Sequence, residues 1–157
     1  MSDSATETIV VPDDRPPGWA NSFVKWALTT PVIEKWLGQT LALLTFRGRR
    51  THKEYVIPVS YWREDDVITI VTKRSRKWWH NFEDPAMVQL RLAGVVYEGK
   101  AGIVTDEEEI LDFMLEYLAK RPVDAKAYGL GKEDIVAEKV SALIPQIVMI
   151  RIELEPA

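Results

Sequence analysis

The sequence predicts an α+β domain in which a six-stranded antiparallel sheet closes into a small barrel with flanking helices. In the middle of the chain, residues alternate at a period of two, and short turns separate the strand segments. Helical periodicity is confined to the two ends and to one lateral segment. The sequence lacks the strand–helix alternation of a parallel sheet and the Gly-x-Gly-x-x-Gly motif of dinucleotide-binding folds.

The N-terminal part predicts an arm followed by two helices. Residues 1–16 are polar and acidic and end in two prolines, which is typical of a flexible arm. Residues 17–38 follow with helical spacing, and Trp19 and Trp26 lie on one face. The tryptophans leave peripheral membrane contact open, but the polar face is not strongly basic, so packing against the sheet is the preferred interpretation. We therefore expect one domain over 17–157, because this length can form its own core.

Strand signals dominate from residue 41 onward. The expected strands are Leu41–Phe46, Tyr55–Tyr61, Val67–Thr72, Met87–Leu92, Val95–Val104 and Gln146–Glu155. Turns are expected at Glu64-Asp65-Asp66 and at Ala93-Gly94.

The helical signals lie between the last two of these strands. Thr105 and Glu108 form a capping box that opens a helix to about Lys120, and Pro122 ends that helix. A looser helix is expected over Glu133–Leu143.

Composition excludes several classes of chemistry and indicates a compartment. The chain has no cysteine, and its two histidines, His52 and His80, are too few for a histidine-rich metal centre, so we expect no metal. No apolar run approaches the roughly 20 residues of a membrane span. The first eight residues lack the basic and apolar regions of a signal peptide, so we expect a cytoplasmic protein.

Positive charge is concentrated in one part of an acidic chain. The formal net charge is −4, which argues against general nucleic-acid binding. Between Arg47 and Lys77, however, nine lysines and arginines face four acidic residues, a net of +5, so the rest of the chain carries −9. This distribution favours a bound anion.

The first basic cluster spans Arg47–Lys53, between two expected strands. Gly48 permits a tight turn, and the Arg49 and Arg50 guanidiniums can bind phosphate bidentately. The alternative is a solvated hairpin tip, which is what a basic run in a turn usually means.

The second cluster spans Lys73–Phe82 and enters a short helix. Trp78 and Trp79 can flank a flat ring, although such residues more often fill a core. His80 has no acidic partner that the sequence assigns, so a structural role is preferred. If the first three strands form consecutive hairpins, the two clusters meet at related ends of one sheet. They would then suit a ligand with phosphate at one end and a flat ring at the other.

Motifs in both clusters resemble one known family, the deazaflavin-dependent nitroreductases, which are split β-barrel flavin- and deazaflavin-binding proteins. The resemblance covers roughly Leu41–Thr105 and rests on Thr45-x-x-Gly48-Arg49-Arg50-Thr51, Pro58, Lys73, Trp78-Trp79-x-Asn81-Phe82 and Pro85. It implies a six-stranded split barrel and a homodimer. It favours coenzyme F-420 as the cofactor, with FMN or FAD as alternatives.

The resemblance also implies a set of cofactor-binding residues. Arg49, Arg50 and Lys73 would contact the phosphate or acidic tail, while Pro58 would line the ring pocket and Trp78 would pack near the ring. Thr51 and Trp79 belong to the same motifs and complete the set. No catalytic residue is assigned, but Tyr117 and Tyr128 lie in the part of the chain where characterised nitroreductases carry substrate-side tyrosines.

The resulting hypothesis is an oxidoreductase whose reduced deazaflavin or flavin passes hydride to a quinone or nitro compound. Because the cofactor performs the chemistry, no catalytic triad or carboxylate pair is required. The alternative is a non-catalytic protein of the same fold that stores, delivers or senses such a ligand. Single-strand nucleic-acid binding through the basic, tryptophan-bearing segment ranks below both, because the chain is acidic overall.

Overall fold

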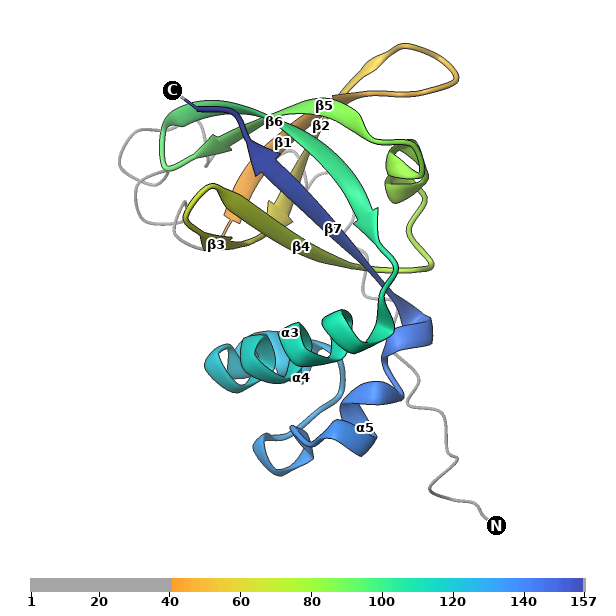
Figure 1. Cartoon of the computed structure of the whole chain (residues 1–157), viewed down its shortest axis with the longest axis vertical. Coiled ribbons are helices and arrows are strands. Elements are labelled where there is room, and N and C mark those ends of the chain that lie inside the picture. Colours follow the sequence, from red (N-terminus) through yellow and green to blue (C-terminus); the bar gives the residue numbers. More distant parts are fainter. Residues whose placement is uncertain (1–40, 157) are drawn as a thin grey trace. The chain divides into compact units, whose positions relative to one another are not determined.

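The computed structural model describes residues 41–156, and Figure 1 shows their arrangement. The arm and the helices expected within residues 1–38 lie outside this range. The strands are β1 Leu41–Arg47, β2 Glu54–Ser60, β3 Trp62–Glu64, β4 Val67–Lys73, β5 Ala86–Leu92, β6 Val95–Val104 and β7 Ile147–Leu154. The α-helices are α3 Glu107–Lys120, α4 Pro122–Ala127 and α5 Ala137–Ser141, and the 3₁₀ turns are η2 Trp78–Phe82, η3 Lys132–Asp134 and η4 Ile144–Gln146.

The strands form one curled antiparallel sheet, which confirms the split-barrel fold class. Their order is β2-β1-β5-β6-β7-β4-β3, so the described sheet has seven strands where we expected six. The seventh is β3, which follows β2 after the single residue Tyr61 and pairs with β4, Trp62 lying opposite Thr69. The Asp65 turn that joins β3 to β4 has a φ of 54°, a left-handed conformation that aspartate tolerates.

The core of the sheet contains apolar side chains of β1, β5 and β7. Leu44 in β1 lies opposite Ile57 in β2 and Leu90 in β5, and both leucines are fully buried. In β7 the first four residues are all buried. Burial of these apolar side chains is the main favourable term in the stability of the sheet.

The β5–β6 hairpin agrees with the sequence expectation. Leu92 pairs with Val95, which leaves Ala93 and Gly94 as the two-residue turn. Both have positive φ, 47° and 87°, the combination required by the tight turn that suits a twisted antiparallel pair.

The described residues divide into two compact units. We call residues 41–71, 77–103 and 149–156 the strand unit, and residues 72–76 and 104–148 the helical unit. None of the described helices is long and apolar enough to cross a membrane.

The helical unit corrects the expected helix boundaries. The N-cap of α3 is Asp106 rather than Thr105, because the Asp106 carboxylate accepts hydrogen bonds from the Glu108 and Glu109 amides. Pro122 comes after the end of α3, as expected, and it is also the first residue of a further helix, α4. At that position the missing N–H of proline loses no hydrogen bond within the helix. The looser helix expected over residues 133–143 is two elements, η3 and α5.

Candidate functional site

The loop between β1 and β2 closes on itself around Gly48. The Gly48 amide donates to the Lys53 carbonyl and the His52 amide to the Gly48 carbonyl, both at 2.8 Å. A Cβ at Gly48 would lie 2.8 Å from the Thr51 hydroxyl oxygen and 3.0 Å from the Tyr55 ring, so only glycine fits without a shift. The loop therefore has a defined conformation, and it exposes the side chains of residues 49 and 50.

A second segment, η2, is joined to this loop through Asn81. The Asn81 side-chain amide donates to the Trp78 carbonyl at 2.8 Å, and its oxygen accepts from the Arg49 backbone N–H at 2.9 Å. Phe82 and Trp79 are buried and anchor η2 in the strand unit. Asn81 thus connects η2 to the basic loop between β1 and β2, through a hydrogen bond between residues that are 32 apart in the sequence.

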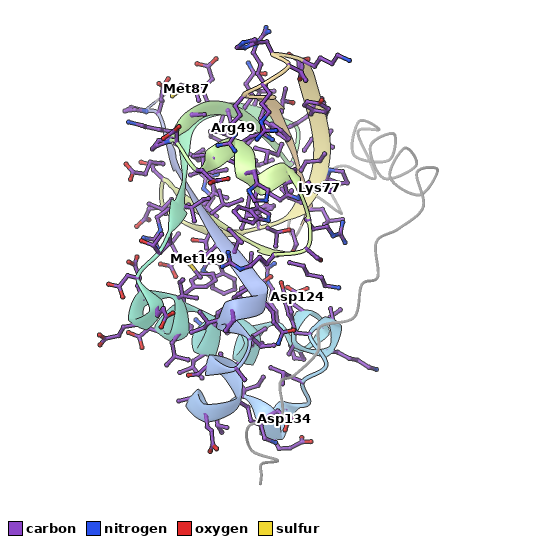
Figure 2. The ribbon with its side chains drawn as sticks, turned by 90° about the vertical axis from the view of Figure 1, so that its right-hand side faces the viewer. Arg49, Lys77, Met87, Asp124, Asp134 and Met149 are labelled. Carbon is purple, nitrogen blue, oxygen red and sulfur yellow. The ribbon has the colours of Figure 1, made fainter. Side chains whose placement is uncertain are left out.

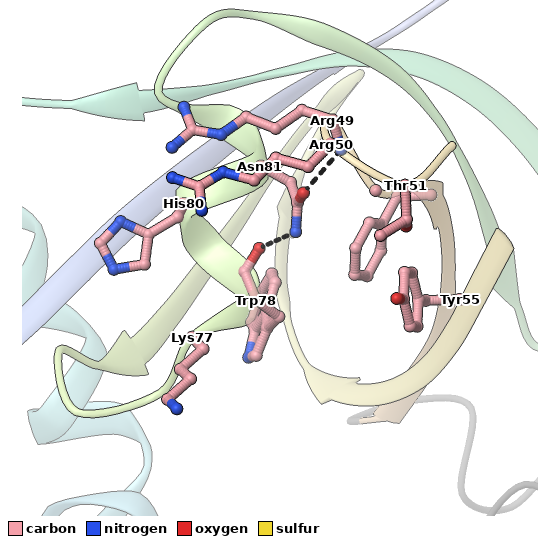
Figure 3. A pocket seen from close by; sticks show the side chains of 10 residues that line it. Arg49, Arg50, Thr51, Tyr55, Lys77, Trp78, His80 and Asn81 are labelled. Atoms are coloured by element: carbon pink, nitrogen blue, oxygen red, sulfur yellow. Dashed lines mark hydrogen bonds between the residues drawn. The ribbon is translucent and has the colours of Figure 1, made fainter. Parts of the chain in front are cut away.

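These two segments enclose a pocket of about 620 Å³ in the strand unit, shown in Figure 3. Its lining residues are Phe46, Gly48, Arg49, Arg50, Thr51, Tyr55, Lys77, Trp78, His80 and Asn81. The Arg49 and Arg50 guanidiniums and the His80 ring point to one side of Asn81, and the Trp78 and Tyr55 rings lie away from them, lower in the view. Figure 2 places Arg49 and Lys77 on the same unit.

The aromatic side of the pocket is a packed cluster around Phe46. Its ring lies 5.6 Å from Tyr55, 6.2 Å from Trp78 and 5.4 Å from Phe82, between ring centres. Contacts at these distances and tilts are favourable beyond the area they bury. Trp78 is half-buried and Tyr55 exposed, so this wall keeps ring surface that a flat ligand can cover.

The cationic side combines Arg49, Arg50 and His80 with one carboxylate, Glu83. The Glu83 Oε1 lies 3.3 Å from the Arg49 Nη2 and 2.6 Å from the His80 Nδ1. Arg50 makes no hydrogen bond or ion pair with any residue between 41 and 156. The pairing corrects the expectation that His80 lacks an acidic partner. The sequence signal for this pair was the spacing of three residues between His80 and Glu83, because a 3₁₀ turn brings residues at that spacing together.

Glu83 titrates below its ordinary range. The hydrogen bond with His80 lowers the Glu83 pKa most, and the positive charges of Arg49, His80 and Arg50 lower it further. A carboxyl group whose pKa is lowered by folding stabilises the folded state above its ordinary pKa of 4.5, and this contribution disappears as the pH falls through the lowered value.

We therefore expect an NMR titration of the Glu83 carboxyl carbon to give a midpoint below 4.5, since the folded protein favours the ionised form. His80→Ala should move the midpoint up toward 4.5 by a larger amount than Arg50→Ala, because the His80 hydrogen bond is the largest cause. A wild-type midpoint at or above 4.5 would contradict this account.

The structure brings together part of the expected site. Of the seven expected cofactor-binding residues, Arg49, Arg50, Thr51 and Trp78 line the pocket. The remaining three are Trp79, Pro58 and Lys73. Trp79 is buried and stacks on the His80 ring, and Pro58 lies in β2 opposite Leu43. Lys73 is the last residue of β4 and belongs to the helical unit. Their contact with a cofactor stays a prediction. The pocket adds Phe46, Gly48, Tyr55, Lys77, His80 and Asn81, which we had not assigned as cofactor-binding residues.

The way the two clusters meet differs from the expected one. Strands β2 and β4 are not neighbours in the strand order, so consecutive hairpins do not join the clusters, and the Asn81 bonds do. Within the second cluster, Arg74 has a structural role in the helical unit. Its side chain donates to the carbonyls of Pro145 and Ile147 at 3.0 and 2.9 Å.

Tyr117 and Tyr128 are both buried in the helical unit. The Tyr117 hydroxyl donates a hydrogen bond of 2.6 Å to the carboxylate of Asp124, which is labelled in Figure 2. Arg121 also pairs with Asp124 and lies over the Tyr117 ring, 5.4 Å from its centre. Tyr117 therefore serves the packing of α3 against α4.

Comparison with known proteins supports the fold and indicates a family. The family model described as F420H(2)-dependent quinone reductase matches residues 22–127, more than half of the chain. No curated protein matches the sequence.

Solved structures with a similar fold include three that this chain matches over most of its length. HutZ, a heme storage protein from Vibrio cholerae, has 10% identity and a TM-score of 0.56, with 83% of this chain and 92% of that chain covered. A putative pyridoxamine 5'-phosphate oxidase from Listeria innocua has 13% identity and a TM-score of 0.53, with 80% and 91% covered. A structure described as a domain-swapped dimer has 16% identity and a TM-score of 0.55, with 88% and 100% covered. At these identities the likeness shows a shared fold.

Proposed function

The chain belongs to the F420H(2)-dependent quinone reductase family, and we propose that it binds coenzyme F-420 and passes hydride from it to a small organic acceptor. The family match confirms the resemblance to deazaflavin-dependent nitroreductases. The acceptor we propose is a quinone or a nitro compound. FMN and FAD remain the alternative cofactors.

One observation carries this proposal: a single pocket has arginines on one side and aromatic rings on the other. Its volume of about 620 Å³ falls within the range of small-molecule sites. The residues fit the chemistry of the group, because guanidiniums suit a phosphate or carboxylate tail and exposed aromatic faces suit a flat ring. We propose that Arg49 and Arg50 hold the tail, and that Trp78 and Tyr55 cover the ring.

When bound, the deazaflavin supplies the hydride, so the protein contributes binding, orientation and electrostatics. The Asn81 side chain contributes orientation, because its hydrogen bonds set where the Arg49 backbone lies relative to Trp78. The exposed Thr51 side chain lines the pocket and accepts a hydrogen bond from the Lys53 amide at 3.3 Å, so its hydroxyl hydrogen can point to a ligand. We also keep Lys73, Pro58 and Trp79 as proposed cofactor contacts.

We further propose a cytoplasmic homodimer. The support for a dimer is the fold shared with a structure described as a domain-swapped dimer. Size-exclusion chromatography with light scattering would measure the oligomeric state directly.

The test is to mix the purified protein with F-420, FMN and FAD and to follow fluorescence and absorbance. We expect micromolar binding of F-420, and oxidation of reduced F-420 when a quinone or nitro compound is added. Failure to bind any of the three would refute the proposal. Tight binding without turnover of any acceptor would favour the non-catalytic binding protein instead.

A further inference from the structure

Glu83 does not line the pocket itself, but its carboxylate contacts two of the cationic residues that do. A single oxygen, Oε1, contacts both Arg49 and His80, at 3.3 and 2.6 Å. Arg49 and His80 line the pocket, and the Arg50 charge also acts on Glu83. The carboxylate therefore already uses part of the positive charge that an anionic ligand would need.

The contact with Arg49 is one that a ligand can displace. The side chains of Arg49 and Glu83 are 37% and 44% exposed, and exposed ion pairs contribute little to stability. The contact is long and uses one oxygen, whereas a phosphate can take both guanidinium nitrogens. Arg49 also does not depend on Glu83 for its backbone position, because Asn81 accepts its N–H.

We propose that Glu83 is a specificity-determining residue that competes with the ligand's anionic tail for Arg49 and His80. This inference rests on the proposed function of the same pocket. Glu83 weakens binding through like-charge repulsion, and the penalty grows with each negative charge that the tail brings near it. The site would thus disfavour multiply charged tails more than tails with a single phosphodiester.

The experiment compares Glu83→Gln with a matched control, Asp84→Asn. Both variants remove one negative charge from adjacent exposed positions, but only the Glu83 carboxylate contacts Arg49 and His80; Asp84 forms no ion pair with either. The probes are F-420 and the deazaflavin that has the same ring and ribityl chain but no phosphate tail. Dissociation constants are measured by fluorescence at low and high salt.

We expect Glu83→Gln to bind F-420 about three- to tenfold more tightly than wild type at low salt, which is the effect of one unit charge at several ångströms in a mostly aqueous setting. The affinity for the tail-free deazaflavin should be unchanged. Asp84→Asn should alter either affinity by less than about twofold, and high salt should reduce the gain in Glu83→Gln.

The outcomes separate this inference from the proposed function. If F-420 binds but Glu83→Gln binds it equally or more weakly, Glu83 instead orients Arg49, and the inference is wrong while the function stands. If no variant binds either deazaflavin, the proposed function fails. The competition by Glu83 is then tested by an NMR titration of the same proteins with pyrophosphate. Tighter binding of pyrophosphate to Glu83→Gln than to wild type supports the competition, and equal binding overturns it.

Discussion

Replacing Arg49 and Arg50 together with alanine should weaken F-420 binding by about 100-fold, the largest effect that we expect from this structure. Each guanidinium can form charge-assisted hydrogen bonds with the tail, and the loss of one such partner typically costs about 1.5 kcal/mol. Both side chains are exposed, and Arg50 has no hydrogen bond or ion pair within residues 41–156, so the fold should tolerate the change.

The control for this double variant is Lys100→Ala. Lys100 is an exposed cation in β6 that does not line the pocket, so its loss should change the affinity by less than about twofold. Binding is measured by fluorescence titration, and thermal unfolding verifies that each variant is folded. A loss below about fivefold in a folded double variant would show that the tail binds elsewhere.

The second large effect is expected at Asn81, where one side chain connects both segments of the pocket. Asn81→Ala removes the acceptor for the Arg49 N–H and the donor to the Trp78 carbonyl. The free energy of unfolding should fall by about 2 kcal/mol, since each lost hydrogen bond costs about 1 kcal/mol. F-420 binding should weaken by about tenfold, because the loop that presents residues 49 and 50 loses its attachment to η2.

Asn81→Asp distinguishes the two hydrogen bonds. The carboxylate keeps the acceptor for the Arg49 amide but cannot donate to the Trp78 carbonyl. Hydrogen exchange of the Arg49 amide should therefore become much faster in Asn81→Ala and change little in Asn81→Asp. Equal protection of this amide in wild type and in Asn81→Ala would show that Asn81 does not hold the loop.

Local sequence patterns were sufficient for most of the strands and for four of the ten residues that line the pocket. An apolar run located β1, alternation at a period of two located β2 and β7, and the residue pair Ala93-Gly94 predicted the hairpin of β5 and β6, because these signals depend on near neighbours alone. The loop motif around Gly48 identified Arg49 and Arg50 in the same way. The resemblance to the family rested on the same local motifs.

Tertiary structure decided what near neighbours do not determine. The short strand β3 forms because β4 is available as a partner, and the three residues Trp62–Glu64 carry no periodicity long enough to detect. The choice of Asp106 over Thr105 as N-cap likewise depends on which side chain reaches the free amides. The order of strands, which separates β2 from β4, is a matter of long-range pairing.

The sequence alone determined that this protein concentrates positive charge in two segments of an antiparallel sheet, with aromatic residues beside the second. Only the tertiary structure decided how the segments combine: Asn81 joins the β1–β2 loop to η2, and Glu83 offsets part of the charge. The physical reason is that a charge count adds residues regardless of position. A binding site depends on which donors and acceptors meet, and here those partners are 32 and 34 residues apart.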